Sequence, residues 1–250
     1  MKKLFTLTLL FTAISICFLS CSKEDDVLTP GTIFTSGGIY YKVTSSAPLT
    51  IAVTYTPNNS YGYSGTIRMP DLVTYCGISY SVTSIGVEAF EDCDGLTSVA
   101  IPNSVTSIGA FAFSDCSGLT SVTIGSSVMS IGDYAFNRCS SLTTITIPSS
   151  VTSIGASAFS NCTGLTSITI PSSVTKIGDD AFFMCYKLTT LYAYATKPID
   201  ANSLRGVFYS VNTATCVLHV PIGSKSLYAT ADGWKDFANI VEDLPITSHK

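Results

Sequence analysis

The stretch that decides the fold is VTSIGASAFSNCTGLTSITIPSS, residues 151–173, and it recurs almost unchanged on both sides of itself. Five such copies follow one another with a constant step of 23 residues. They begin at Val82, Val105, Val128, Val151 and Val174, and each carries one cysteine at the same place, namely Cys93, Cys116, Cys139, Cys162 and Cys185. Self-similarity at a fixed period of this size is typical of a solenoid, in which consecutive copies stack along one axis.

Two spacings of apolar residues coexist within one copy. Leu165, Ile168 and Ile170 form the pattern Leu-x-x-Ile-x-Ile, whose last step has the two-residue period of a β-strand. A step of four residues, typical of one face of a short helical segment, is carried by Ile154, Ala158 and Cys162. We therefore predict an α/β solenoid with a parallel β-sheet on one face and short helical or 3₁₀ returns, beginning near Gly155, on the other. A single copy buries too little apolar surface to offset the entropy of ordering its backbone, so the copies must stack.

The pattern Val-x-x-Ile-Gly-x-x-Ala-Phe-x-x-Cys-x-x-Leu-x-x-Ile-x-Ile-Pro, residues 151–171, resembles the BspA-like leucine-rich repeat. The flanks also resemble this family, through residues 38–42 and 75–80 on the amino-terminal side and residues 220–224 and 233–237 on the carboxy-terminal side. The resemblance implies a leucine-rich repeat fold wound as a right-handed coil and capped at both ends. Two departures stand out: Gly125 replaces the strand-ending proline of the second copy, which suggests a looser turn, and the fifth copy drifts into Tyr192-Ala193-Tyr194.

The domain organisation follows from where the copies begin and end. We predict a signal peptide at 1–20, a flexible tether at 21–35, a β-rich amino-terminal cap at 36–81, five repeats at 82–195, and a carboxy-terminal capping unit and tail at 196–250. Caps are required because the terminal coils of a solenoid otherwise leave an apolar face and a strand edge open. In the last unit we expect a strand at 215–220, a helix near 224–231, and a plug formed by Trp234 and Phe237.

The amino terminus has the composition of a secretory leader. Lys2 and Lys3 precede an apolar run, residues 4–19, that is short for a membrane span. The end of the run, Leu19-Ser20-Cys21, resembles the lipobox of bacterial lipoproteins, which implies a lipid on Cys21; ordinary cleavage near a small residue is the alternative. The charged run 22–26 is similar to the export signal of Bacteroidetes surface lipoproteins, although a solvated linker also accounts for it. Acyl chains would then attach the protein to the outer membrane, exposed at the cell surface.

Charge excludes one class of partner. Removing Lys2 and Lys3 from the 13 basic side chains leaves 11 against 17 acidic ones, a formal charge of −6. This balance offers no basic patch for a phosphate backbone, so we expect no nucleic-acid partner.

The cysteine column is predicted to be a packing feature. Equivalent positions on neighbouring coils have parallel Cβ vectors, which suits disulfide geometry poorly, and a spacing of 23 residues gives no clustered ligand set for a metal. We predict no metal and no cofactor. A bridge that involves Cys76 or Cys216 is left open.

Residues for catalysis are scarce. The two histidines are His219 and His249, and no Gly-x-Ser-x-Gly nucleophile motif is present. The acidic residues Asp133, Asp179 and Asp180 fall at variable positions of the return and fit a solvated face better than a glycosidase pair. We therefore predict a protein that is not an enzyme.

Recognition suits this scaffold better, because a ladder presents a long, rigid face that reorganises little on binding. Three groups are candidate ligand contacts. The first consists of the outward strand residues Ser121, Thr123, Thr144, Thr146, Ser167, Thr169, Thr190 and Tyr192, which would form two hydroxyl columns, although threonine and serine also simply suit exposed strands. The second is the pair Phe111 and Tyr134, at equivalent places of adjacent coils, for which packing over a neighbouring coil is the alternative. The third is the loop with Tyr61 and Tyr63, which packing within the cap would equally explain.

The leading hypothesis is a lipid-anchored surface protein that binds a macromolecule. The family resemblance implies an adhesin or an interaction module for a host extracellular-matrix or other surface protein. A glycan-binding accessory lipoprotein is the first alternative, and an architectural envelope protein is the second.

Overall fold

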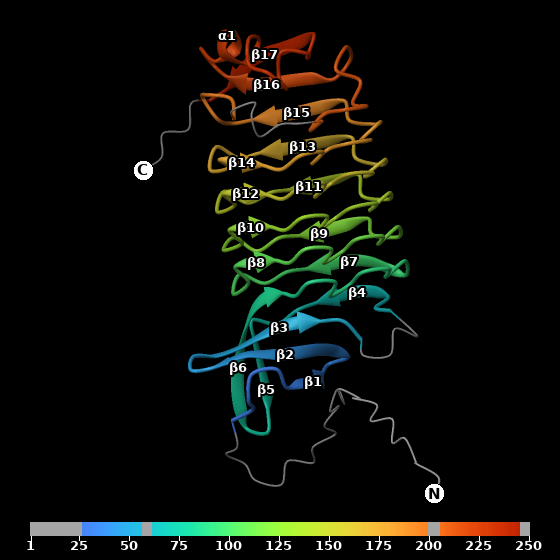
Figure 1. Ribbon diagram of the computed structural model, residues 1–250, viewed down its shortest axis with the longest axis vertical. Coiled ribbons are helices and arrows are strands. Elements are labelled where there is room, and N and C mark those ends of the chain that lie inside the picture. The colour runs from blue at the N-terminus through green and yellow to red at the C-terminus, as the bar shows by residue number, and fades with distance from the viewer. Residues whose placement is uncertain (1–26, 57–61, 200–205, 246–250) are drawn as a thin grey trace, which may run out of the picture.

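A computed structural model describes residues 27–56, 62–199 and 206–245. The repeats stack as parallel coils along one long axis, with the amino-terminal strands at one end and the carboxy-terminal unit at the other (Figure 1). Each coil has three sides: a long strand, a short strand and a return made of turns. No helix in the described ranges is long and apolar enough to cross a membrane.

The long strands form the ladder that the apolar alternation predicts. A three-stranded part contains β4 (Gly65–Arg68), β7 (Leu96–Ala100) and β9 (Ser121–Thr123), and a five-stranded part contains β11 (Thr144–Thr146), β13 (Ser167–Ile170), β15 (Thr190–Ala193), β16 (Val217–Pro221) and β17 (Asn239–Leu244). All of these pairs are parallel, and Ser98 lies opposite Ser121 just as Thr144 lies opposite Ser167. Leu165, Ile168 and Ile170 are at most 3% exposed, so their inward orientation is confirmed.

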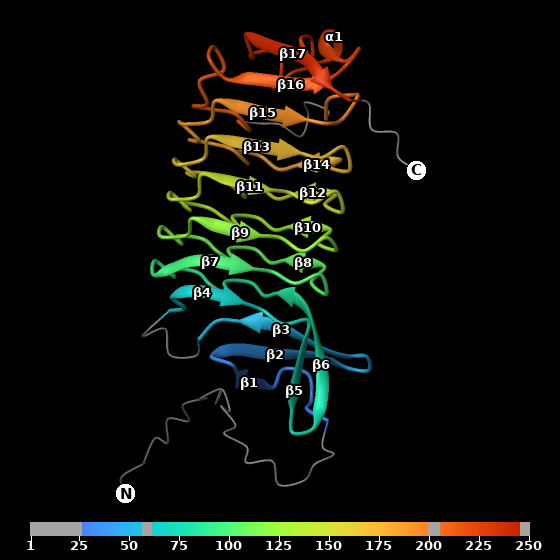
Figure 2. The ribbon, with the colours of Figure 1, turned by 180° about the vertical axis from the view of Figure 1, so that it is seen from behind.

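A second parallel ladder lies on another side of the coil (Figure 2). It runs from β6 (Ile78–Ile85) through β8 (Ser107–Ile108), β10 (Ser130–Ile131), β12 (Ser153–Ile154) and β14 (Lys176–Ile177). These strands could not be predicted from the sequence, because two residues are too few to show an alternation.

The prediction of helical or 3₁₀ returns is wrong: each return is a series of hydrogen-bonded turns. Ser157 and Asn161 have positive φ values of 52° and 59°, and the equivalent residues of the other coils do as well. Such left-handed residues interrupt a helix and point the backbone N–H groups at the next coil. The N–H of Phe159 therefore donates to the carbonyl of Ala181 over 2.8 Å. In the described residues the α-helix is confined to α1 (Lys225–Tyr228), shorter than the expected 224–231.

Two columns of identical side chains fill the interior. The phenylalanines stack with nearly parallel rings, at centroid distances from 4.9 to 5.7 Å, in the order Phe90, Phe113, Phe136, Phe159, Phe182 and Phe208. The five repeat cysteines lie beside them and are buried. Stacking along the axis therefore supplies each coil with apolar contacts that it cannot make alone.

Gly125 does not mark a looser turn. A Cβ at this residue would lie 2.2 Å from the carbonyl oxygen of Pro102, so the missing side chain allows a closer approach to the preceding coil. Nearby, the pairing of the long strands is interrupted between β9 and β11.

The two ends of the stack differ from the regular repeats. At the amino-terminal end, antiparallel pairing joins β1 (Ile33–Ser36), β2 (Ile39–Ser46) and β3 (Leu49–Thr54), as well as β5 (Leu72–Tyr75) and β6, while β3 pairs with β6 in parallel. At the other end, Trp234 and Phe237 pack edge-on against Phe208, each with ring centroids 5.1 Å apart. These aromatic contacts end the phenylalanine column.

Candidate functional site

The outward side chains of the long strands form the two predicted hydroxyl columns. One contains Ser121, Thr144, Ser167 and Thr190, and the other contains Thr123, Thr146, Thr169 and Tyr192. The residues of the first two of these coils, Ser121, Thr123, Thr144 and Thr146, are exposed. Those of the next two coils, Ser167, Thr169, Thr190 and Tyr192, are half-buried. Neighbouring parallel strands lie about 4.8 Å apart, so the hydroxyls repeat at that interval along the axis.

Within residues 27–56, 62–199 and 206–245, the hydroxyl groups of these columns make no hydrogen bond to the protein. A different threonine column, immediately before them in each strand, is used: the side chains of Thr120, Thr166 and Thr189 each donate to a carbonyl of the preceding coil over 3.0 to 3.2 Å. The structure gives no such bond to Thr144, Thr146 or Thr169 in the described part of the chain. Their donors and acceptors therefore remain available to solvent or to a ligand.

An aromatic and charged group ends the second column. The ring of Tyr192 stacks on that of His219, with centroids 4.6 Å apart and planes at 22°. A carboxylate oxygen of Asp243 lies 2.8 Å from Nδ1 of His219, within hydrogen-bond distance. This contact fixes the orientation of the imidazole ring. His219 was not among the ligand contacts predicted from the sequence. The pairing with Asp243 could not be foreseen, because the partner lies 24 residues away in the poorly repetitive carboxy-terminal unit.

The second candidate pair is brought together on the side of the returns. The rings of Phe111 and Tyr134 are stacked with centroids 4.7 Å apart and planes at 3°. Tyr134 is 38% exposed and Phe111 is half-buried. Phe183 and Tyr209 form a similar stack at 5.6 Å nearer the carboxy-terminal end of the same side, and sequence reasoning missed it because Tyr209 lies outside the regular repeats.

Tyr63 is not an exposed ligand contact, so this prediction is wrong. Its side chain is 7% exposed and its ring packs at 4.6 Å on that of Phe90. Its hydroxyl donates to the carbonyl of Thr54 at 2.9 Å and accepts from the backbone N–H of Tyr40 at 3.0 Å. Tyr63 therefore joins the amino-terminal strands to the first coil. Tyr61 lies outside the described residues, as does Cys21.

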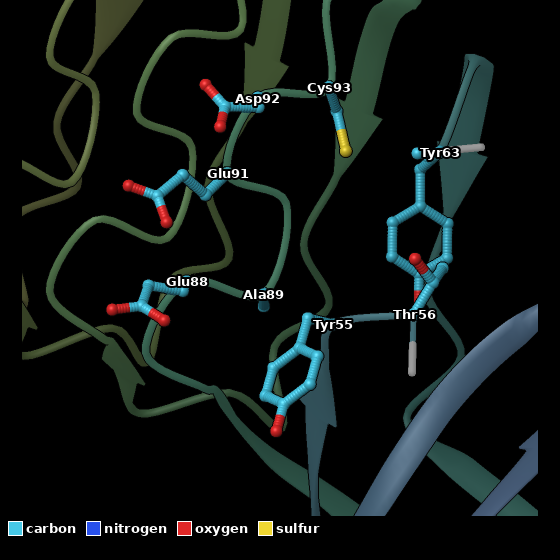
Figure 3. Close-up of a pocket in the computed structure, with 9 residues that line it drawn as sticks. Tyr55, Thr56, Tyr63, Glu88, Ala89, Glu91, Asp92 and Cys93 are labelled. Atoms are coloured by element: carbon cyan, nitrogen blue, oxygen red, sulfur yellow. The ribbon is translucent and has the colours of Figure 1, made fainter. Parts of the chain in front are cut away.

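A small cavity of about 280 Å³ lies beside Tyr63 (Figure 3). Its walls include Tyr55 and three acidic residues, Glu88, Glu91 and Asp92. Burial and the neighbouring negative charges, Glu88 before Asp92 and Asp115, raise the pKa of the Glu91 carboxyl. The three carboxylates point away from the rings of Tyr55 and Tyr63, so they face the surroundings rather than one another across the cavity.

The cysteine column has no features of a reactive or metal-binding site. The repeat cysteines and Cys216 are free and buried, whereas Cys76 is disulfide-bonded. Burial raises the pKa of the Cys185 thiol to about 12 and that of Cys216 to about 11, which keeps both protonated. Within the described ranges, no three His, Cys, Asp or Glu side chains are grouped so as to hold a metal ion.

The acidic residues of the returns are separate rather than paired as an acid and a base. Asp133 accepts a hydrogen bond from the backbone N–H of Ala156 in the next coil, at 2.7 Å. Asp179 is exposed and Asp180 is half-buried beside Gly206. Asp133 therefore has a structural role in joining coils.

The fold and its exposed faces define a leucine-rich repeat solenoid. Residues 71–201 match the model of the BspA type leucine-rich repeat region, in six copies. Because this match covers more than half of the chain, the chain belongs to the BspA-type leucine-rich repeat family.

Solved structures of similar proteins agree with this assignment. A leucine-rich repeat protein of T. pallidum is 27% identical over 77% of this chain and 80% of its own, with a TM-score of 0.62. A leucine-rich repeat protein of Bacteroides ovatus is also 27% identical, over 75% of this chain and 55% of its own, with a TM-score of 0.58. No curated protein matches the chain significantly in sequence.

Proposed function

We propose that the protein is a surface-displayed binding module without catalytic activity, and that it binds another protein through the return side of its coils. The observation that carries this proposal is the exposed stack of Phe111 on Tyr134. Tyrosine and phenylalanine are enriched at protein interfaces, and tyrosine is among the residues that contribute most to binding. An extracellular-matrix or other host surface protein is the class of partner that the family resemblance favours.

The backbone does not account for these aromatic residues. Phe111 and Tyr134 both have a φ of 56°, a left-handed conformation that bulky side chains adopt at a cost. The equivalent residues in other coils are Glu88, Ser157 and Asp180, which have the same conformation. The fold therefore accepts polar residues at this place, and the aromatic pair adds surface for recognition rather than for folding.

The location at the cell surface belongs to the same proposal. Residues 1–20 have the composition of a leader, and Cys21 follows a lipobox-like sequence. We propose a lipid on Cys21 that attaches the protein to the outer membrane, with the coil exposed. Labelling with a radioactive fatty acid should mark the native protein and not its Cys21→Ala variant, and external protease should remove the coil from intact cells.

The binding proposal is tested with the purified protein against immobilised extracellular-matrix proteins and host glycoproteins. At least one should bind, and the double variant Phe111→Ala, Tyr134→Ala should lower its affinity about tenfold or more. Tyr209→Ala is the matched control, because it removes an exposed stacked ring of the same side in a different coil. Absence of binding across the panel, or an equal loss in the control, would overturn the proposal.

A further inference from the structure

The second hydroxyl column changes abruptly in size between two adjacent coils. Thr169 of β13 lies opposite Tyr192 of β15, and Tyr192 lies opposite His219 of β16. Two small threonines, Thr146 and Thr169, are thus followed along the axis by two stacked rings. The result is a step on the outer face of the sheet, with hydroxyls on its lower level and aromatic rings on its upper level.

The step leaves one face of a tyrosine ring uncovered. Because Tyr192 and His219 stack along the solenoid axis, His219 covers the face of Tyr192 that looks towards the carboxy-terminal end. The opposite face looks towards Thr169, whose side chain is too short to cover a six-membered ring. The residue of the same column one coil further on is Val241, and the His219 side chain between Tyr192 and Val241 is only 18% exposed.

The upper level of the step is held in place. Nδ1 of His219 lies 2.8 Å from one carboxylate oxygen of Asp243 and 3.0 Å from the other, and the histidine side chain is only 18% exposed. Its Nε2 makes no hydrogen bond to the described part of the chain. Stacking on this fixed ring restrains the Tyr192 side chain, so this side chain loses little conformational entropy when a ligand binds.

The lower level is neutral and rich in unused hydroxyls. From β7 to β15 the two columns contain serine, threonine, alanine and tyrosine and no charged side chain. The hydroxyls of Thr146, Ser167 and Thr169 make no hydrogen bond within the described residues, whereas those of Thr166 and Thr189 do. A ligand here meets donors and acceptors at an interval of about 4.8 Å, with no charge to attract an ionic partner.

From these observations we infer that the step between Thr169 and Tyr192 binds a neutral oligosaccharide. One sugar ring stacks its C–H face on the open face of Tyr192 above Thr169, and Nε2 of His219 and the threonine hydroxyls bond to sugar hydroxyls. Further sugar units follow the columns towards Thr146. A protein partner fits less well, because the columns offer few of the apolar or arginine anchors on which protein interfaces depend.

This inference is independent of the proposed protein binding. It concerns a different ligand and the strand side rather than the return side of the coil. It also differs from the predicted glycan contact of the amino-terminal loop, where Tyr63 is buried.

The test is calorimetric titration of the purified protein with maltohexaose, cellohexaose, laminarihexaose, mannohexaose and xylohexaose. At least one should bind, with an affinity that does not change between low and high salt. Tyr192→Ala should lower that affinity about tenfold, since it removes the stacking surface. Thr169→Tyr should abolish binding, because it continues the column of rings and covers the open face while keeping a residue that suits a strand.

Tyr186→Ala is the control, because it removes an exposed tyrosine from outside the strand face and should leave binding unchanged. The inference is overturned if none of the five sugars binds, or if Tyr192→Ala and Thr169→Tyr bind as the original protein does. It is equally overturned if Tyr192→Ala weakens only the binding of a protein partner. Loss of protein binding in the Phe111 and Tyr134 variant, with sugar binding retained, would show that the two sites are separate.

Discussion

The thiol of Cys162 donates a hydrogen bond to the carbonyl oxygen of Phe136 in the preceding coil, with 3.1 Å between Sγ and O. Cys116, Cys139 and Cys185 make the same contact with Phe90, Phe113 and Phe159. The bond supplements a long backbone contact of 3.3 Å from the N–H of Cys139 to the same Phe136 oxygen. A cysteine at this place is therefore a small apolar residue that also donates a hydrogen bond to a buried carbonyl.

Replacement of Cys162 by alanine should destabilise the fold without changing its shape. We expect the free energy of unfolding to fall by about 1–3 kcal/mol, because the variant loses both the thiol bond and the packing of the sulfur atom. Urea unfolding measures the change. Thr163→Ala, at the half-buried neighbouring residue, should change it by less than about 0.5 kcal/mol. Equal stability of the two variants would show that the cysteine column does not hold the coils together.

Stability should fall at alkaline pH. Burial in the folded protein raises the pKa of the Cys185 thiol to about 12 and that of the Cys216 thiol to about 11. In the unfolded chain a thiol has a pKa of about 8.5. A raised pKa means that the fold favours the neutral thiol. The contribution of each thiol to stability is complete below the pKa of the unfolded thiol. It is lost as pH rises from that value towards the pKa of the thiol in the folded protein. We expect a loss of about 1 kcal/mol per thiol for each pH unit above about 8.5.

Urea unfolding between about pH 7 and about pH 10 measures this dependence, across the unfolded thiol value. The double variant Cys185→Ala, Cys216→Ala should show a smaller decline than the original protein, since two of the titrating groups are absent. An identical slope in both proteins would refute the explanation.

Gly155→Ala should be strongly destabilising. A Cβ on Gly155 would lie 2.4 Å from the backbone nitrogen of Asp133, and backbone atoms of a packed coil cannot move aside cheaply. We expect a loss of about 3 kcal/mol or more, at the upper end of overpacking effects. Thermal unfolding measures it, with Ser153→Ala in the same coil as the control. A Gly155→Ala protein as stable as the control would mean that the coils are not stacked this closely.

Tyr63→Phe should loosen the amino-terminal strands. The hydroxyl of Tyr63 bonds both the carbonyl of Thr54 and the N–H of Tyr40, so its removal leaves two backbone groups without this partner at a cost of about 1–3 kcal/mol. Hydrogen exchange at the Tyr40 amide should become faster. Tyr55→Phe, which changes an exposed tyrosine nearby, should leave the exchange unaltered. Slow exchange in the Tyr63 variant would contradict the structural role assigned to this residue.

Much of this protein could be predicted from its repeats alone. Identical spacing in successive copies places equivalent residues one above another, so the inward orientation of Ile168 and Ile170 and the stacking of Phe111 on Tyr134 follow from the period. The buried cysteine column follows for the same reason. Hydrophobic alternation was sufficient here because each long strand has one face in the core and one face in solvent.

The tertiary structure decided what the period does not encode. A step of four residues is also typical of a helix, but left-handed residues such as Ser157 and Asn161 point their N–H groups at the next coil, so that hydrogen bonds form between coils. The burial of Tyr63 and the pairing of His219 with Asp243 depend on contacts with segments outside the repeats, whose positions the period does not specify. Sequence determines which residues share a column, because spacing is local. Only packing determines which of those columns remain open to a ligand.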